Sequence, residues 1–250
     1  MKAAPLVLLP IRLGSRSPIL KTCSTEGLFT LRDAPLQPRG RIPRLGTRTR
    51  RWEYAVNEPW AAIGIRSGDR VLDVGFRDVL ELEALATRVG PTGWVIGIDV
   101  DRRRVAAAVA ALSGRTSGRV EVSCGSLLDL PYDDASFDLV LCKGVLHEVR
   151  RPDAAVAEMG RVCRTGGVVC LIEMKRFSRL HFELYRWKAW LRGRRTGDIW
   201  PGFTRQRVEQ AMTRGGLEVE RYEILPTMWR LGDIRIEPFL VRAVRRSAGS

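Results

Sequence analysis

Two short apolar runs, each containing an acidic residue near its end, constrain the fold of this chain more than any other feature. They are VLDVG, residues 71–75, and VIGIDVD, residues 95–101. Runs of this length that are rich in Val and Ile and stop at Gly or Asp are typical of strands buried on both faces of a parallel sheet. Residues 79–89 between them have the apolar spacing of a helix. This order of strand, helix and strand predicts an α/β fold with an open sheet.

The same unit places two carboxylates, those of Asp73 and Asp99, at the carboxyl ends of neighbouring strands. Ligands of open α/β sheets bind at that edge. Apolar runs and helical periodicity continue along the rest of the chain. They predict helices at residues 52–65, 101–113, 151–163 and 204–214, strands at 120–124, 137–142 and 167–173, and a terminal antiparallel strand pair at 217–225 and 238–244.

The chain from Val71 to Glu173 resembles the class I S-adenosylmethionine (SAM)-dependent methyltransferases, and within them the ubiquinone and menaquinone methyltransferase branch, type 11. A second motif, LDLPYDDASFDLVLCKGVLHEVRRPDAAVAEMGRVCRTGGVVCLIE at residues 128–173, supports the resemblance. Two separated motifs in the expected order are more specific than a lone glycine pattern. The resemblance implies a doubly wound, Rossmann-like methyltransferase sheet. This sheet would be mostly parallel, with an antiparallel C-terminal strand pair and helices on both faces.

The resemblance also implies SAM as the cofactor and a set of residues around it. Asp73 and Gly75 would bound the amino acid end of SAM, and Asp99 would accept hydrogen bonds from both ribose hydroxyls. The other implied cofactor-binding residues are Val100 beside Asp99, Ser126 and Leu127 flanking the adenine, and Cys142 and Lys143 on the cofactor-facing loop after the fourth strand. No metal site is predicted.

The glycine-rich turn of this chain departs from the pattern D-x-G-x-G-x-G that is usual in the family. Its three glycine positions hold Gly75, Arg77 and Val79, and the adenine loop has Ser126 where an acidic residue is common. Glycine suits such turns because it tolerates positive φ and close approach to a ligand. The leading prediction is a SAM-dependent methyltransferase with an unidentified acceptor. The alternative is a noncatalytic methyltransferase-like protein that binds RNA or a large assembly.

Positive charge is concentrated at the two ends of the chain. The net charge is +14, yet residues 52–174 hold 14 Lys and Arg against 18 Asp and Glu. Residues 1–51 hold 11 against 2, and residues 175–250 hold 17 against 8. We interpret residues 1–51, which are rich in Pro and Arg, as an extension, and residues 52–250 as the methyltransferase-like domain. The basic flanks favour contact with RNA or an anionic membrane surface. An arginine-rich proteome would explain them equally, and the methyl acceptor is either a small molecule or RNA.

An insertion at residues 175–203 follows the fifth predicted strand and contains an amphipathic helix. Its apolar stripe consists of Leu180, Leu184, Trp187 and Leu191. This spacing is typical of a helix with one buried face. We therefore expect a lid packed on the core, with a membrane surface or RNA as the alternative partner of the helix.

His147 is the candidate catalytic base, because it follows the fourth strand close to where a methyl group would be delivered. A histidine with a pKa of about 6.5 can deprotonate a nucleophile at neutral pH. A structural role for His147 is the alternative, since many transferases act mainly by positioning their substrates. Glu148 and Glu173 are further candidates on the same rim.

Cysteine usage and the N-terminal composition bear on the compartment. Five cysteines without a CxxC pair indicate buried thiols in a reducing compartment rather than disulfides or a metal site. We expect the cytoplasm. A mitochondrial or other organelle matrix is the alternative, because residues 1–25 contain basic residues and no acidic ones. No apolar segment reaches the length of a transmembrane helix.

Overall fold

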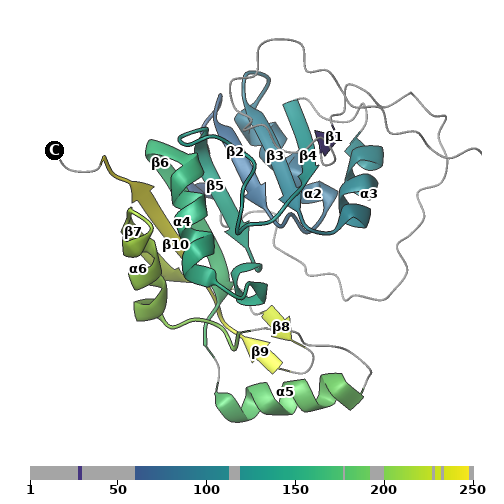
Figure 1. Ribbon diagram of the computed structural model, residues 1–250, viewed down its shortest axis with the longest axis vertical. Helices are drawn as coiled ribbons and strands as arrows, with labels where there is room; N and C mark the ends of the chain where they lie inside the picture. The colour runs from purple at the N-terminus through teal and green to yellow at the C-terminus, as the bar shows by residue number, and fades with distance from the viewer. Residues whose placement is uncertain are drawn as a thin grey trace, which may run out of the picture.

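A sheet of eight strands forms the centre of the computed structural model, which describes residues 28–29, 60–112, 119–176, 178–191, 200–226, 229–231 and 234–247. Its strand order is β1-β4-β3-β2-β5-β6-β10-β7 (Figure 1). The strands are β1 (Leu28–Phe29), β2 (Arg70–Val74), β3 (Trp94–Asp99), β4 (Arg119–Cys124), β5 (Phe137–Lys143), β6 (Cys163–Met174), β7 (Leu217–Ile224) and β10 (Pro238–Arg245).

Strands β2 to β6 pair in parallel, and β10 pairs antiparallel with both β6 and β7. The predicted mostly parallel sheet with an antiparallel C-terminal pair is therefore confirmed. Most of the predicted extension, residues 1–51, lies outside the described residues, as do residues 52–59 of the first predicted helix. The described part of the extension, β1, pairs antiparallel with β4 at the sheet edge.

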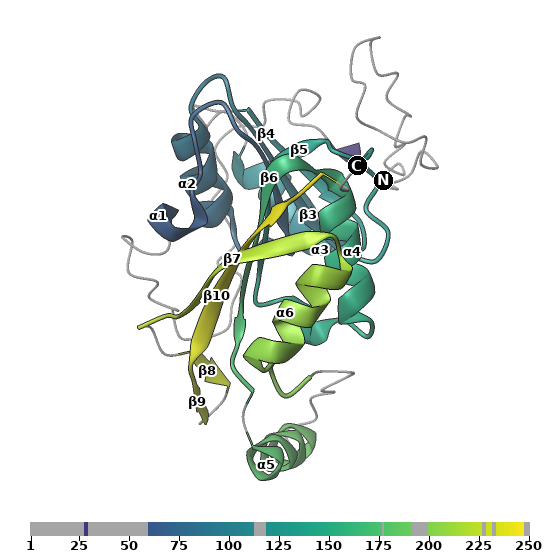
Figure 2. The same ribbon diagram turned by 90° about the vertical axis from the view of Figure 1, so that its left-hand side faces the viewer.

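Helices cover both faces of the sheet, as Figure 2 shows for α2 and α4. The helices are α1 (Trp60–Ile63), α2 (Val79–Val89), α3 (Arg102–Leu112), α4 (Pro152–Val162), α5 (Arg179–Leu191) and α6 (Arg205–Arg214), with one 3-10 turn, η2 (Leu146–Glu148). Alternate residues of β2 face opposite layers. Val71 belongs to the buried cluster that includes α2 and α3, whereas Leu72 belongs to the cluster that includes α4 and α6. Both faces are apolar, which explains why the strands are apolar runs.

Local capping explains where several helices begin. The Asp78 side chain accepts a hydrogen bond from the Glu81 amide at 3.1 Å and caps α2, and Thr204 caps α6 through the Arg207 amide at 3.2 Å. Pro152 opens α4, at a position where its missing N–H has no helical partner. The predicted bounds of α2 agree with the structure, those of α4 differ by one residue at each end, and those of α6 differ by one residue at the start.

Three strands were not predicted, namely β1 and two further short strands. The strands β8 (Trp229–Leu231) and β9 (Ile234–Ile236) form a separate two-stranded antiparallel sheet between β7 and β10 in the chain. Strand β6 also begins earlier than predicted, at Cys163, directly after α4.

The predicted packing of α5 on the core is wrong for its apolar stripe. The four stripe side chains are 78%, 42%, 55% and 58% exposed, for Leu180, Leu184, Trp187 and Leu191 respectively. In both views α5 lies apart from the sheet and from the helices that cover it (Figure 1 and Figure 2). No helix in the described ranges is long and apolar enough to cross a bilayer.

Candidate active site

Asp73 lies at the carboxyl end of β2 and is 1% exposed. Its Oδ2 atom is buried and has no hydrogen-bond partner within the described residues. Burial, followed by repulsion from Glu81, raises the pKa of this carboxyl well above its usual range. A buried polar atom without a partner is costly. Asp73 therefore fits a ligand that brings a cationic donor, such as the ammonium of an amino acid.

The turn after β2 needs glycine at one position. Gly75 has a φ of +71°, donates a hydrogen bond from its amide to the Ile98 carbonyl at 2.6 Å, and sits so close to Val145 that a Cβ would collide with that side chain. Among the residues that the structure describes, Ala135 is the only non-glycine with a positive φ. Arg77 and Val79 therefore occupy backbone conformations open to any residue. The loss of the other two glycines is compatible with this turn.

Asp99, at the end of β3, is 4% exposed and forms an ion pair in the structure. Its Oδ2 accepts a hydrogen bond from Arg104 Nη1 at 2.6 Å, and its Oδ1 accepts one from the Asp101 amide at 2.8 Å. Each carboxylate oxygen has two lone pairs, so each retains capacity for a further donor. A pair of ribose hydroxyls fits that capacity.

Lys143 and Glu81 form a largely buried ion pair beside Asp73, with the lysine 12% and the glutamate 6% exposed at their side chains. The Lys143 ammonium also lies 6.0 Å from the centre of the Trp60 ring. Lys143 is the last residue of β5 rather than part of the following loop. The Lys143 ammonium and the Glu81 carboxylate thus lie next to Asp73 at the end of β2.

The prediction that Cys142 lies on a cofactor-facing loop is wrong. Cys142 lies within β5 and is fully buried, and burial raises the pKa of its thiol well above the usual range. Its side chain is part of the core on the α4 side. A small apolar side chain packs well there, whereas a thiolate would be unfavourable.

The predicted adenine loop follows β4. Ser126 makes an isolated bridge with Asp129, and its Oγ accepts a hydrogen bond from the Leu128 amide at 3.1 Å. Leu127 is 5% exposed, whereas Val100 across the strand ends is 72% exposed. Val100 therefore presents an apolar side chain at the surface next to the buried Asp99. This position suits contact with a flat aromatic ring such as adenine.

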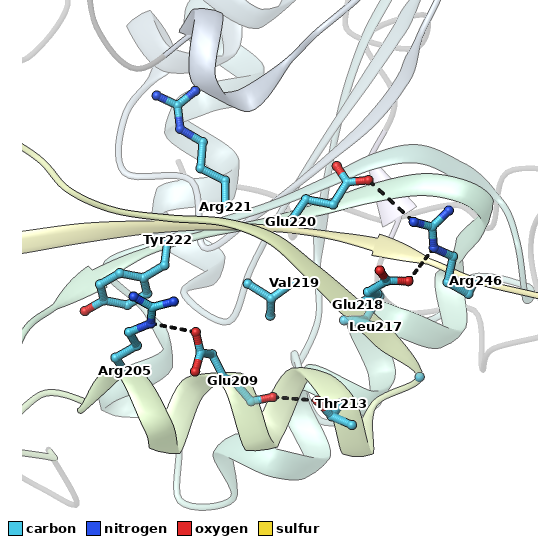
Figure 3. A pocket seen from close by; sticks show the side chains of 11 residues that line it. Arg205, Glu209, Thr213, Leu217, Glu218, Val219, Glu220, Arg221, Tyr222 and Arg246 are labelled. Atoms are coloured by element: carbon cyan, nitrogen blue, oxygen red, sulfur yellow. Dashed lines mark hydrogen bonds and ion pairs between the residues drawn. The ribbon is translucent and has the colours of Figure 1, made fainter.

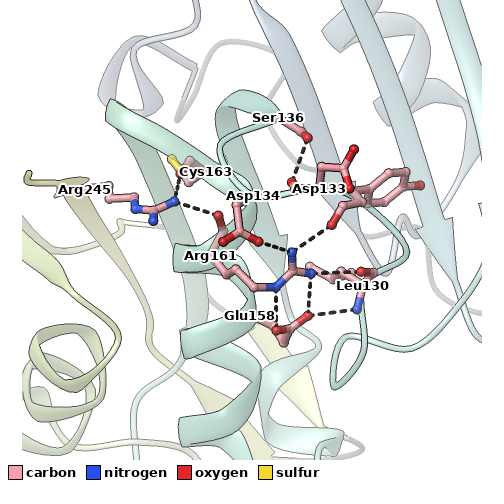
Figure 4. Close-up of polar contacts among 9 residues, drawn as sticks. Leu130, Asp133, Asp134, Ser136, Glu158, Arg161, Cys163 and Arg245 are labelled. Carbon is pink, nitrogen blue, oxygen red and sulfur yellow. Dashed lines mark hydrogen bonds and ion pairs between the residues drawn. The ribbon is translucent and has the colours of Figure 1, made fainter. Parts of the chain in front are cut away.

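Arg161 of α4 holds the continuation of this loop in place (Figure 4). Its guanidinium donates to the carbonyls of Leu130 and Tyr132 at 2.9 and 2.8 Å, and to Asp134 at 2.8 Å. Glu158 accepts two more of its hydrogen bonds and itself accepts one from the Leu130 amide at 3.0 Å. The hydrogen bond to Glu158 is the main reason that the Arg161 pKa is raised. Arg161 thus ties the adenine loop to α4.

His147 and Glu173 form a buried pair at the ends of β5 and β6. His147 Nδ1 lies 2.9 Å from Glu173 Oε2, and Glu173 is fully buried. Glu173 also accepts a hydrogen bond from the Met174 amide at 3.1 Å. Desolvation lowers the His147 pKa, but the charge and hydrogen bond of Glu173 outweigh it, so the net pKa is raised. The carboxylate orients the imidazole, which leaves Nε2 as the other titratable nitrogen.

Trp200, near the end of the insertion, is hydrogen-bonded to the backbone beside this pair. The Trp200 amide donates to the His147 carbonyl at 2.7 Å, and the Trp200 indole donates to the Val149 carbonyl at 3.0 Å. The insertion is therefore attached to the His147 end of the sheet, although the stripe on α5 is exposed. Within the described ranges, no group of three His, Cys, Asp or Glu side chains is placed to hold a metal ion.

A surface hollow between α6 and β7 lies away from these strand ends (Figure 3). Its charged side chains pair with one another, since Arg205 contacts Glu209 at 2.7 Å and Arg246 contacts Glu218 at 2.6 Å. It contains none of the predicted cofactor residues and is remote from β2 and β3 in the strand order. The chemistry at the strand ends, rather than this hollow, defines the candidate site.

The doubly wound sheet, the glycine turn and the two strand-end carboxylates are features of the class I SAM-dependent methyltransferase fold. Residues 72–171 match the family model described as a methyltransferase domain. The predicted resemblance is confirmed, and with it the assignment to a SAM-dependent family. The individual contacts to SAM stay predictions.

Similar proteins include the demethylmenaquinone methyltransferases of Symbiobacterium thermophilum and Geobacillus kaustophilus. The first is 34% identical over 56% of this chain and 57% of its own length, and the second is 30% identical over 50% and 55%. The chain thus spans little more than half the length of these relatives. A solved SAM-dependent methyltransferase from Aquifex aeolicus has the same fold, with a TM-score of 0.58 and 22% identity over 74% of this chain and 86% of that chain.

A phosphoethanolamine N-methyltransferase from Haemonchus contortus, solved in complex with SAM, also shares the fold. Its TM-score is 0.57, with 13% identity over 74% of this chain and 51% of that chain.

Two side chains of the site, Glu81 and Arg161, were not singled out from the sequence, and the pairing of Glu173 with His147 was not predicted. Glu81 follows the cap residue Asp78 by three positions, which is the spacing of a capping box and a usable signal. The role of Glu173 as the partner of His147 depends on the pairing of β5 with β6. Arg161 has no local signal, because its partners are 27 to 31 residues away along the chain except for Glu158.

Proposed function

We propose that this chain transfers a methyl group from SAM to a small-molecule acceptor held at the carboxyl ends of β5 and β6. The observation that supports this most directly is the buried, unpartnered Oδ2 of Asp73 beside the glycine turn. It offers an acceptor for the SAM ammonium at the edge of the sheet where ligands of such folds bind. Asp99 then accepts from the ribose hydroxyls, and Val100 and Leu127 flank the adenine.

When bound, SAM supplies an electrophilic methyl group on a sulfonium. The chain's own residues position the two reactants and exclude water, which by itself accounts for a large part of the rate enhancement in such reactions. The buried acids at these strand ends, including Asp73, Glu81 and Glu173, disfavour a polyanionic acceptor there. A small molecule is therefore favoured over RNA as the acceptor.

We further propose that His147 is the base that accepts a proton from the acceptor. Glu173 fixes the ring through Nδ1, at 2.9 Å, so that the proton is taken at Nε2. A carboxylate in this position also stabilises the imidazolium that forms. The raised pKa places His147 closer to being protonated at neutral pH, so methyl transfer should increase as the pH rises through that pKa.

The cofactor site is tested by calorimetric titration with SAM and with S-adenosylhomocysteine. Asp99→Ala should weaken binding of both about 10- to 100-fold, because it removes charge-assisted hydrogen bonds to the ribose. Asp101→Ala is the matched control: it is acidic, exposed and two residues away, and the amide that contacts Asp99 remains. Equal affinities for the wild type and both variants would contradict the assignment of Asp99.

The second candidate function is a noncatalytic binding protein that uses its basic flanks. The observation in its favour is that Arg77 and Val79 replace two family glycines. If the native chain binds no SAM and Arg77→Gly restores binding, Arg77 blocks the site and this second function replaces the first. RNA binding that depends on salt and on residues 1–51, without SAM binding, would support it.

A further inference from the structure

Helix α5 carries half of the large apolar side chains that are exposed in the described part of the chain. Eight such side chains are exposed, and four of them are the α5 stripe of Leu180, Leu184, Trp187 and Leu191. Their spacing puts them on one face of a helix of 13 residues. The apolar faces of α2, α4 and α6 are buried against the sheet, so α5 differs from them. An apolar patch of this kind marks an interaction surface.

The charge around the stripe is strongly positive. Residues 175–195 contain eight Lys and Arg and one acidic residue, Glu183. Arg179 and Arg186 are exposed on α5 beside the stripe, and Arg176 is exposed just before it. Arg192, Arg194 and Arg195 follow in the sequence and lie outside the described residues. A helix with Leu and Trp on one face and cations beside them fits the interface of an anionic membrane.

We propose that α5 docks on an anionic membrane surface, with Leu180, Leu184, Trp187 and Leu191 inserted among the lipids and the flanking arginines at the headgroups. Lipid is favoured over RNA because three of the four stripe residues are leucines, which do not stack on bases. The arginine side chains can reach the headgroups while their apolar stems lie along the interface. This docking is independent of methyl transfer.

The position of α5 determines which end of the sheet would face the membrane. The chain enters the insertion from Met174 at the end of β6 and returns through Phe203, whose amide donates to the Met174 carbonyl at 2.9 Å. Trp200 meanwhile contacts His147. A membrane bound by α5 therefore lies at the end of the sheet where His147 and Glu173 are. If the proposed function holds, the acceptor is a lipophilic molecule that reaches the site from the membrane.

Docking is tested by co-sedimentation of the full chain with phosphatidylcholine vesicles, with and without one third phosphatidylglycerol. We expect binding to the anionic vesicles that weakens at high salt. The double variant Leu184→Glu with Trp187→Glu should lower the partition coefficient about tenfold or more, because two charges replace inserted side chains. Trp187→Phe should retain binding. The matched control is Leu80→Glu on α2, a leucine that is 69% exposed and outside the stripe, and it should bind like the wild type.

Three outcomes would overturn the proposal. The first is a wild-type chain that does not bind anionic vesicles. The second is equal binding by the wild type and the double variant, which would assign any membrane contact to the basic flank at residues 1–51. The third is a dimeric wild type that the double variant converts to a monomer in light scattering, which would assign the stripe to a second copy of the chain. Because vesicle binding is measured without SAM, failure of the methyltransferase assignment would leave this test unaffected.

Discussion

Replacing Gly75 by alanine should destabilise the protein by a predictable amount and for two separable reasons. The residue has a φ of +71°, and a left-handed conformation costs a non-glycine residue about 1–2 kcal/mol. The added Cβ also collides with Val145, and overpacking of this kind costs about 1–3 kcal/mol. Together they predict a loss of about 2–5 kcal/mol in the free energy of unfolding.

The two contributions are separated by adding Val145→Ala, which removes the colliding methyl groups. Alone, this change should cost about 1 kcal/mol, since Val145 is only partly buried. In the double variant the collision disappears and the backbone cost remains. A double-mutant cycle from urea unfolding, followed by circular dichroism, should therefore give a favourable coupling of about 1–3 kcal/mol.

Gly202 provides the matched control for this cycle. It has a φ of +84°, and a Cβ there would lie 2.7 Å from the carbonyl oxygens of Lys175 and Met174. Because these are backbone atoms, Val145→Ala should not rescue Gly202→Ala. If Gly75→Ala and Val145→Ala prove additive within about 0.5 kcal/mol, the collision is not the cause and the reasoning fails.

Three further predictions concern ionisation and the adenine loop. In NMR titration of the two imidazoles, the His147 pKa should lie above its usual value and should fall in Glu173→Gln, because the charge and the hydrogen bond that oppose desolvation are then removed. The His147–Glu173 pair thus stabilises the fold below a pH of about 6.5, and this stabilisation is lost as the pH rises through the raised pKa of His147. The same His147 pKa in the wild type and in Glu173→Gln would contradict the pairing. Arg161→Met should lower the free energy of unfolding by about 2–4 kcal/mol and weaken SAM binding. The control Arg205→Met, at an exposed arginine, should lower the free energy of unfolding by less than about 1 kcal/mol. Asp73→Asn should raise the melting temperature at pH 8 and weaken SAM binding. The gain in melting temperature should vanish below a pH of about 4, where the Asp73 carboxyl is protonated in both the folded and the unfolded protein. A lower melting temperature at pH 8 would refute the argument that a buried charge destabilises the native protein.

The sheet, with its two strand-end carboxylates, was predictable from the sequence because its signals are local. VLDVG and VIGID are continuous apolar runs, and such runs form strands whichever neighbours they have. Helix α2 was predictable to its end residues because an apolar periodicity coincides with a capping aspartate, Asp78. The three-residue strands β8 and β9 were not predicted, since so short a segment shows no periodicity.

The parts of the site that escaped prediction depend on contacts between distant residues. Periodicity identified the apolar face of α5 but not what that face contacts, and the assumption that it meets the core was wrong. Arg161 reaches its loop partners only because α4 packs beside the loop, which no local pattern reveals. The apolar pattern placed Cys142 in a strand at 137–142, one residue short of the end of β5, whereas the family resemblance placed Cys142 and Lys143 on the loop that follows.

The attachment of the insertion has an evolutionary consequence. The described part of the insertion is joined to the molecule at Met174, Phe203 and Trp200, whereas the predicted cofactor residues lie at the ends of β2, β3 and β5 and in the loop after β4. Changes in the length or composition of the insertion therefore leave the β2 turn and Asp99 in place. On the proposed function, replacing this single segment would exchange one acceptor for another and leave the predicted cofactor residues of β2 and β3 unchanged.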